Sequence, residues 1–106
     1  MIQSPFMITY DSLLKDPRVE AAIGDEKPVV VRTVLLDLLS TYRTVEIDLS
    51  SARTLTPSFA YIAFGHLYDV HRESLLERLH FVNDAKTLAS RILAAISRRR
   101  DVVLAQ

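Results

Sequence analysis

The 106-residue sequence has no cysteine, only two glycines and four prolines, and no excess of either charge. The absence of cysteine excludes disulfides, thiolate zinc sites and cysteine nucleophiles. Thirteen basic side chains balance thirteen acidic ones, which disfavours general electrostatic binding of DNA or RNA. No apolar run approaches the roughly 20 residues of a membrane span, and the first residues lack the basic start and apolar block of a signal peptide. We therefore expect a single cytoplasmic domain over residues 1–106.

Four segments have the composition or periodicity of β-strands. Residues 44–50 give the clearest pattern, because Val45, Ile47 and Leu49 alternate with polar residues. The other predicted strands are residues 6–10, 28–31 and 78–82, with a short extra strand or docking tail at 102–104. Strands covered on both faces read as continuous apolar runs, whereas the segments at 44–50 and 78–82 alternate. We therefore expect helices on one face of the sheet and a largely open second face.

Four further segments predict helices from their caps or apolar stripes. They are a short helix from Asp16-Pro17 to Gly24, a helix at 32–41, a longer helix that starts at Thr56-Pro57, and a last helix from Asn83-Asp84 to the arginines at 98–100. In the longer helix, Phe59, Leu67 and Val70 are among the residues of the predicted apolar face. Alternating strands and helices indicate an α/β fold with a mixed β-sheet of about four strands and helices packed mainly on one face.

The stretch VEIDLSSARTLTPSF, residues 45–59, resembles the STAS family, which includes the anti-anti-sigma factors. In that family a strand ends in an Asp-Leu-Ser-Gly-Val type of turn, here residues 48–52, and a helix opens several residues later, here at 56–59. The sequence is more similar to the STAS-like domain of unknown function, with Arg32 in place of an arginine typical before the first helix. The resemblance divides the chain into a variable N-terminal part at 1–29, a similar region at 30–97, and a basic tail or edge strand at 98–106.

This resemblance implies a non-catalytic, protein-binding module of bacterial signalling, of the kind that partners a histidine-kinase-like ATPase. The phosphorylated serine of anti-anti-sigma factors has no counterpart at the same position, because the Asp-Ser pair of that family aligns with Thr56-Pro57. Ser58 lies one residue later. A phosphate on Ser58 or Thr56 would add negative charge at a helix N-terminus and provide a switch. The alternative is that Ser58 only helps to cap the helix.

A polar loop lies between the clearest strand and the helix that follows it. Loops at the carboxyl ends of sheet strands commonly bind ligands or partners, and the guanidinium of Arg53 can pair with a carboxylate or phosphate. The alternative is a solvated turn whose hydroxyls satisfy the local backbone. The predicted partner-binding or regulatory residues are Ser50, Ser51, Arg53, Thr54, Thr56, Ser58 and Tyr61.

Catalytic and metal-binding motifs are missing from the sequence. It has no Gly-rich phosphate loop, no G-x-S-x-G elbow and no Ser-His-Asp pattern, and its three histidines lack ligand spacing. We therefore expect no enzyme, no cofactor and no metal site. Two other functions stay open, namely a structural domain that forms homo-oligomers and a small phosphate- or nucleotide-binding domain. The arginines at 98–100 either cap the last helix or contact an acidic partner.

Overall fold

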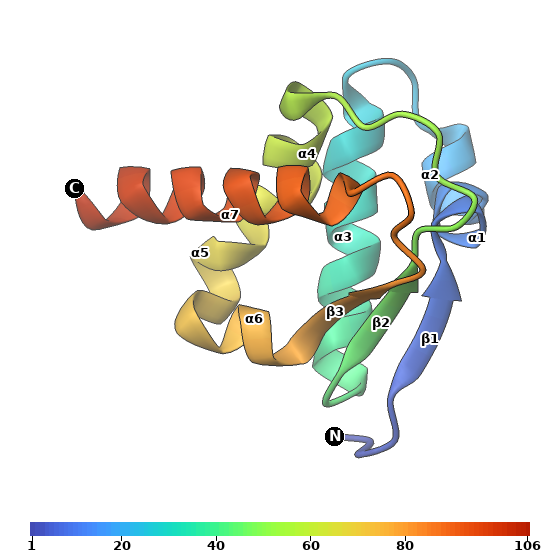
Figure 1. Ribbon diagram of the computed structural model, residues 1–106, viewed down its shortest axis with the longest axis horizontal. Helices are drawn as coiled ribbons and strands as arrows, with labels where there is room; N and C mark the ends of the chain where they lie inside the picture. The colour runs from blue at the N-terminus through green and yellow to red at the C-terminus, as the bar shows by residue number, and fades with distance from the viewer.

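The computed structural model describes residues 1–106 and contains a three-stranded, fully parallel sheet. The strands are β1 (Phe6–Thr9), β2 (Val45–Asp48) and β3 (Leu79–Val82), and they lie in the order β1-β2-β3 (Figure 1). Ile8 pairs with Ile47, which in turn pairs with Phe81. Three of the predicted strands are thus confirmed, whereas the predicted mixed direction is wrong and a fourth strand is not present.

The helices follow the strands in alternation and are mostly short. They are α1 (Tyr10–Leu14), α2 (Pro17–Ala21), α3 (Glu26–Thr41), α4 (Pro57–Ala63), α5 (Tyr68–His71), α6 (Leu75–Arg78) and α7 (Leu88–Leu104), with 3₁₀ turns at η1 (Gly65–Leu67) and η2 (Arg72–Ser74). Asp16 caps α2 as predicted, because its carboxylate accepts a hydrogen bond from the backbone N–H of Arg18. That helix ends at Ala21, before Gly24. None of the helices combines the length and apolar character needed to cross a bilayer.

The two faces of the sheet differ sharply in exposure, as the alternating sequence predicts. Val45 and Ile47 of β2 are fully buried and belong to the main hydrophobic core. On the opposite face Met7 is 66% exposed, and it aligns with Glu46 and His80 of the neighbouring strands. Because no helix buries this second face, the prediction of a one-sided sheet is confirmed.

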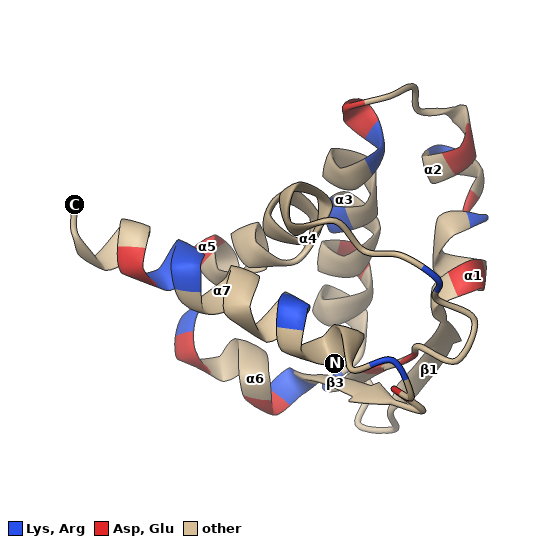
Figure 2. Ribbon diagram, turned by 45° about the horizontal axis from the view of Figure 1, so that its top comes forward, with Lys and Arg blue, Asp and Glu red and all other residues tan.

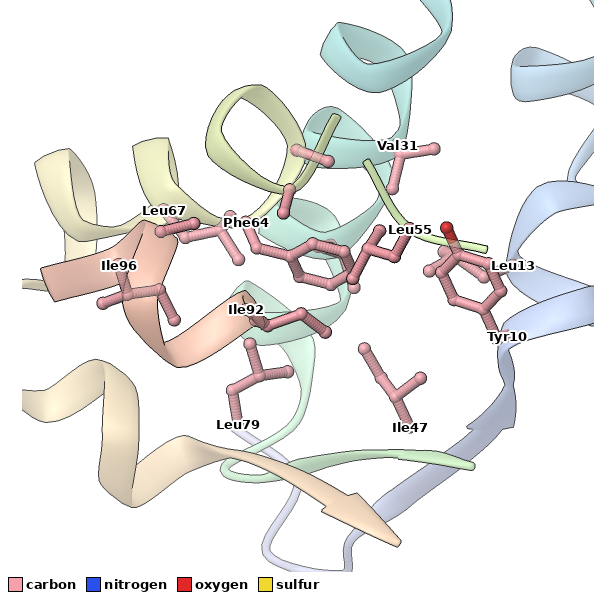
Figure 3. Close-up of a cluster of buried hydrophobic side chains, with 14 of the residues drawn as sticks. Tyr10, Leu13, Val31, Ile47, Leu55, Phe64, Leu67, Leu79, Ile92 and Ile96 are labelled. Carbon is pink, nitrogen blue, oxygen red and sulfur yellow. The ribbon is translucent and has the colours of Figure 1, made fainter. Parts of the chain in front are cut away.

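The core lies between the inner face of the sheet and helices α3, α4 and α7. Figure 3 shows Phe64 at its centre, with Ile92 and Leu79 close by and Tyr10 at one end. Tyr10 and Leu13 are buried in the same cluster, although they lie in the N-terminal part that the resemblance does not cover. Residues 1–29 are therefore part of the fold, since they supply an edge strand and part of the core.

Residues 28–31 lie in the first two turns of α3, so the strand predicted there is wrong. Pro28 fits the first turn because the N–H that proline lacks has no helical acceptor at that position. Val31, Leu35 and Leu39 are fully buried on one face of α3, and their burial outweighs the preference of β-branched residues for strands. Arg32 also lies inside this helix, not before it, and donates a hydrogen bond to the carbonyl of Ile62.

The longer helix predicted from residue 57 is divided into α4, η1, α5, η2 and α6. Arg72 has a φ of 53°, in the left-handed region, which ends α5. This break turns Val70 to the solvent, where it is 62% exposed, so its predicted place in the core is wrong. Leu67 and Leu75, which the sequence also places on the apolar face, are fully buried.

Helix α7 starts later and ends later than the sequence predicts. Asp84 accepts hydrogen bonds from the backbone N–H groups of Leu88 and Ala89, at 2.6 and 2.9 Å, and so caps the helix from four residues upstream. The helix then continues to Leu104, so the predicted strand at 102–104 is wrong, whereas docking of these residues on a partner stays a prediction. The arginines at 98–100 lie inside the helix and do not cap its end.

Arg99 joins α7 to α5 through a two-pronged ion pair. Its Nε and Nη2 atoms lie 2.8 and 2.7 Å from the two carboxylate oxygens of Asp69. Hydrogen bonding by this guanidinium lowers the pKa of Asp69. The pair is partly exposed, with 20% of the Arg99 side chain and 36% of the Asp69 side chain accessible, so its contribution to stability is moderate.

Replacing Asp69 by Asn should lower the free energy of unfolding by about 1 kcal/mol at pH 7. Since folding lowers the pKa of Asp69, the stabilisation is present above the unfolded-state pKa of about 3.9 and is lost as the pH falls through the folded-state pKa. Urea denaturation of both proteins at pH 7, 5 and 3 should therefore show a difference that shrinks at pH 3. Asp101→Asn is the control, because Asp101 is 72% exposed and 3.7 Å from Arg100. A difference that stays constant with pH would contradict the assignment.

Arg78, at the end of α6, is the one buried charged side chain, with 6% of its surface exposed. Its guanidinium points at the C-terminal end of α3 and donates hydrogen bonds to the backbone carbonyls of Leu39, Tyr42 and Arg43. These carbonyls include groups that a helix end leaves without a helical donor. Arg78 therefore connects the entry to β3 with the exit from α3.

Candidate functional site

The loop that leaves β2 is held by buried apolar residues and presents polar ones outward. Leu49, Ala52 and Leu55 are each only 3% exposed. The carboxylate of Asp48 accepts a 2.8 Å hydrogen bond from the backbone N–H of Ser50, which fixes the start of the turn. Hydrogen bonds from Ser50 and then from Asn83 lower the pKa of Asp48. The result is a rigidly anchored loop with an outward hydrophilic edge.

Most of the predicted site residues lie on this outward edge. The structure exposes Ser50, Ser51, Arg53, Thr54, Thr56 and Ser58. Thr56 caps α4 as predicted, because its hydroxyl accepts a 3.1 Å hydrogen bond from the backbone N–H of Phe59. The helix that follows has only seven residues, so the long helix expected to stabilise a phosphate on Ser58 is absent. The roles of these residues in binding or regulation stay predictions.

Tyr61 is partly buried and connects α4 to α7. The guanidinium carbon of Arg98 lies 5.1 Å from the centre of its ring, within cation–π range. Arg99 donates a 3.4 Å hydrogen bond to the Tyr61 hydroxyl, and the His66 ring packs edge-on at 5.1 Å between centres. Tyr61 therefore packs between α4 and α7. It does not belong to the exposed loop with which the sequence analysis grouped it.

A groove of ≈ 490 Å³ runs between α4 and α7 beside the loop. Its lining consists of Pro57, Tyr61, Arg91, Ala94, Ala95 and Arg98. The two alanines form a shallow apolar floor, and the arginines stand toward its two ends, since seven residues are nearly two helical turns. Figure 2 shows the basic positions along α7 and the absence of charged residues from α4. No acidic side chain lines the groove.

The two arginines of the groove have no carboxylate partners within the chain. Arg91 donates a 2.9 Å hydrogen bond to the backbone carbonyl of Leu55, and Arg98 lies over the ring of Tyr61. Neither takes part in the ion pairs of the structure, unlike neighbouring Arg99. The groove therefore has two positive charges that are available to an anionic group from outside.

The sequence predicts only part of this site. It does not distinguish Arg91, whereas Arg98 belongs to the three arginines for which a helix cap and contact with an acidic partner are the two alternatives. The available signal was the spacing R-x-x-A-A-x-x-R over residues 91–98, which places two cations and a small-residue floor on one face of a helix. Nothing in the sequence showed that α4 would lie against that face.

Metal-binding geometry is not formed by the described residues. No group of three or more histidine, aspartate or glutamate side chains is placed to hold an ion. His66 and His71 lie in different elements, η1 and α5. Burial lowers the pKa of both imidazoles, with further lowering by nearby arginines, so both are neutral at pH 7.

These features define a small α/β domain with a one-sided parallel sheet and a polar loop beside a basic groove. Residues 28–89 match the family model of a STAS-like domain of unknown function. The chain belongs to this family, which confirms the resemblance carried by residues 45–59. No curated protein and no solved structure matches the chain. The matched region ends two residues into α7, so Arg91 and Arg98 lie outside it.

Proposed function

We propose that this chain is a non-catalytic regulatory module that binds another protein through one continuous surface. The surface consists of the loop at 50–56, the first turn of α4, and the groove between α4 and α7. The unpaired guanidiniums of Arg91 and Arg98, set above an apolar floor, are the observation that carries the proposal. They favour a partner segment with acidic residues and small apolar side chains.

The dimensions of the groove suggest what such a segment looks like. Seven residues of helix separate the two arginines by about 10 Å along the axis. Carboxylates seven residues apart on a partner helix match that separation and lie on one face of that helix. A surface of this kind fits the family expectation of a histidine-kinase-like ATPase as partner, with an acidic docking segment.

Phosphorylation supplies the proposed regulation of this surface. Ser58 is exposed and follows Pro57, which lines the groove. A phosphate on Ser58 would add a charge of about −1.5 to −2 beside the basic groove. It would compete with the carboxylates of an acidic partner and release that partner.

Site-specific photo-crosslinking tests the proposal in the cells that make this protein. A photoreactive residue at Ala94, on the groove floor, should crosslink to a second protein, and mass spectrometry should place the link in an acidic segment. The same probe at Met7, on the open sheet face, is the matched control and should not capture that protein. Arg91→Glu with Arg98→Glu should weaken the purified complex at least about tenfold, and Ser58→Asp should weaken it in the same direction.

Two results would overturn this function. One is the absence of any protein crosslinked through Ala94. The other is a complex whose affinity is the same for the wild type and for the double charge reversal. Arg18→Glu serves as the charge control in the affinity measurement, because Arg18 pairs with Asp37 on a different part of the surface.

A homo-oligomer is the second candidate, favoured by the uncovered sheet. Parallel sheets are usually covered on both faces, and here β1 and β3 are both edge strands. The open face mixes Met7 with Glu46 and His80, so it is less apolar than the interface of a permanent dimer. Light scattering at high micromolar concentration, which measures the molar mass in solution, tests the homo-oligomer. A strict monomer would contradict it.

A further inference from the structure

A second hollow lies on the other side of the same loop, at the carboxyl ends of β1 and β2. It has a volume of ≈ 380 Å³, within the range of small-molecule sites. Tyr10 directly follows β1, and Thr54 and Thr56 lie in the loop after β2. Crevices beyond the carboxyl ends of parallel strands are the common place for ligands in α/β proteins.

The Tyr10 side chain is buried and yet has an unused donor. Only 6% of Tyr10 is exposed, and its hydroxyl forms no hydrogen bond within the chain. Figure 3 shows the hydroxyl pointing away from the strand, toward the segment that carries Leu55. Burial raises the pKa of Tyr10 to about 12, so the hydroxyl stays protonated and able to donate at neutral pH. Only the Nε2 atom of His71 is both buried and without a partner, so the Tyr10 hydroxyl reaches the surface of the crevice, where it can donate to a ligand.

Lys27 supplies the charge of this crevice. Its ammonium group donates a 3.1 Å hydrogen bond to the carbonyl of Val19, which leaves further N–H donors free. Lys27 forms no ion pair with a carboxylate, and no acidic side chain lines the crevice. Leu14 and Phe59 contribute apolar walls. Anion-binding donors and apolar walls are thus combined in one open crevice.

We propose that this crevice binds a small organic anion. Its carboxylate or phosphate group accepts hydrogen bonds from Lys27 and from the Tyr10 hydroxyl, and its apolar body packs against Leu14 and Phe59. Thr54 and Thr56 place two more hydroxyls at the rim. The site differs from the groove that binds the proposed protein partner, because the two share no lining residue.

Titration of the ¹⁵N-labelled full chain with phenyl phosphate, phenylacetate and benzyl alcohol, followed by amide chemical shifts, tests this site. One of the two anions should give saturable shifts at residues 10, 27 and 54–56, and the neutral alcohol should not. The anion that binds more tightly identifies the head group as phosphate or carboxylate. Lys27→Met should weaken binding about tenfold and Tyr10→Phe several-fold, because each removes a donor to a charged group.

Lys86→Met is the matched control, since Lys86 is exposed outside the crevice, and it should bind the anion as the wild type does. Methionine retains most of the apolar stem of lysine, so the variants should fold, which thermal denaturation checks. The proposal is overturned if neither anion gives saturable shifts, or if Lys27→Met binds as tightly as Lys86→Met. Such a failure leaves the partner groove untouched, because that groove is tested by crosslinking through Ala94.

Discussion

Replacing Arg78 by alanine should lower the free energy of unfolding by about 3–5 kcal/mol, a large share of what a domain of this size has. The guanidinium is the donor for the carbonyls of Leu39, Tyr42 and Arg43, and the bonds to Arg43 and Tyr42 measure 2.9 and 3.1 Å. Alanine would leave the buried carbonyl of Leu39 and the partly buried carbonyls of Tyr42 and Arg43 without this donor, and would open a cavity beside them. Burial, and then the charge of Arg43, lowers the pKa of Arg78.

Two further variants separate the hydrogen bonds of Arg78 from its volume. Arg78→Met retains the apolar stem and removes every donor, so it should be nearly as damaging as alanine. Arg78→Lys retains the charge, but one ammonium cannot replace the spread of a planar guanidinium, so it should recover only part of the loss. Chemical denaturation with a constant m-value measures all three. A methionine variant as stable as the wild type would show that these carbonyls need no donor.

Replacing Gly65 by alanine should cost about 1–3 kcal/mol, because the added methyl group has no space. A Cβ atom at this position would lie 2.9 Å from the backbone oxygen of Ala95 and 3.3 Å from its carbonyl carbon. Both are main-chain atoms, so α7 itself must move. Ala95 also lines the groove between α4 and α7, so the displacement should change that groove as well as the stability.

Gly24 offers a control that separates crowding from backbone conformation. Its φ is +55°, and nothing lies within 4 Å of where a Cβ atom would stand. Gly24→Ala should therefore cost only about 1 kcal/mol, the price of a left-handed residue, and Gly24→Asn should cost less. Thermal denaturation measures the loss of stability in each variant, and the ¹⁵N spectra show whether α7 moves. Equal losses for alanine at 24 and at 65, with no spectral change in α7, would contradict the crowding explanation.

The strands were predictable because their apolar and polar residues alternate, as expected for a sheet with one buried face and one exposed face. Val45 and Ile47 are buried, whereas Glu46 between them is partly exposed, so local sequence and tertiary environment agree. At residues 28–31 they disagree, since three consecutive valines favour a strand by local preference but form a helix. These residues form a helix because one face of it is buried against the core. The residues that cover this face lie far away in the sequence, so the local pattern does not show it.

Parts of the candidate site were predictable from local sequence, and other parts depend on tertiary contacts. The polar loop and the Thr56 cap were predictable, because turn and cap chemistry is local. The roles of Arg91, the Tyr10 hydroxyl and Lys27 were not predictable, because each gains its role from residues distant in sequence. Arg91 lies 36 residues from the carbonyl that it contacts, for example, and no local pattern records that separation.

Leu55 connects the groove between α4 and α7 with the crevice beside Tyr10. Its carbonyl accepts the hydrogen bond from Arg91, and the residue also lines the crevice that contains Tyr10 and Lys27. Because Leu55 contacts Arg91 of one site and lines the other, we expect the effects of substitutions at Lys27 and Arg91 not to simply add. A double-mutant cycle across Leu55 would give the size and sign of that coupling as a single free energy.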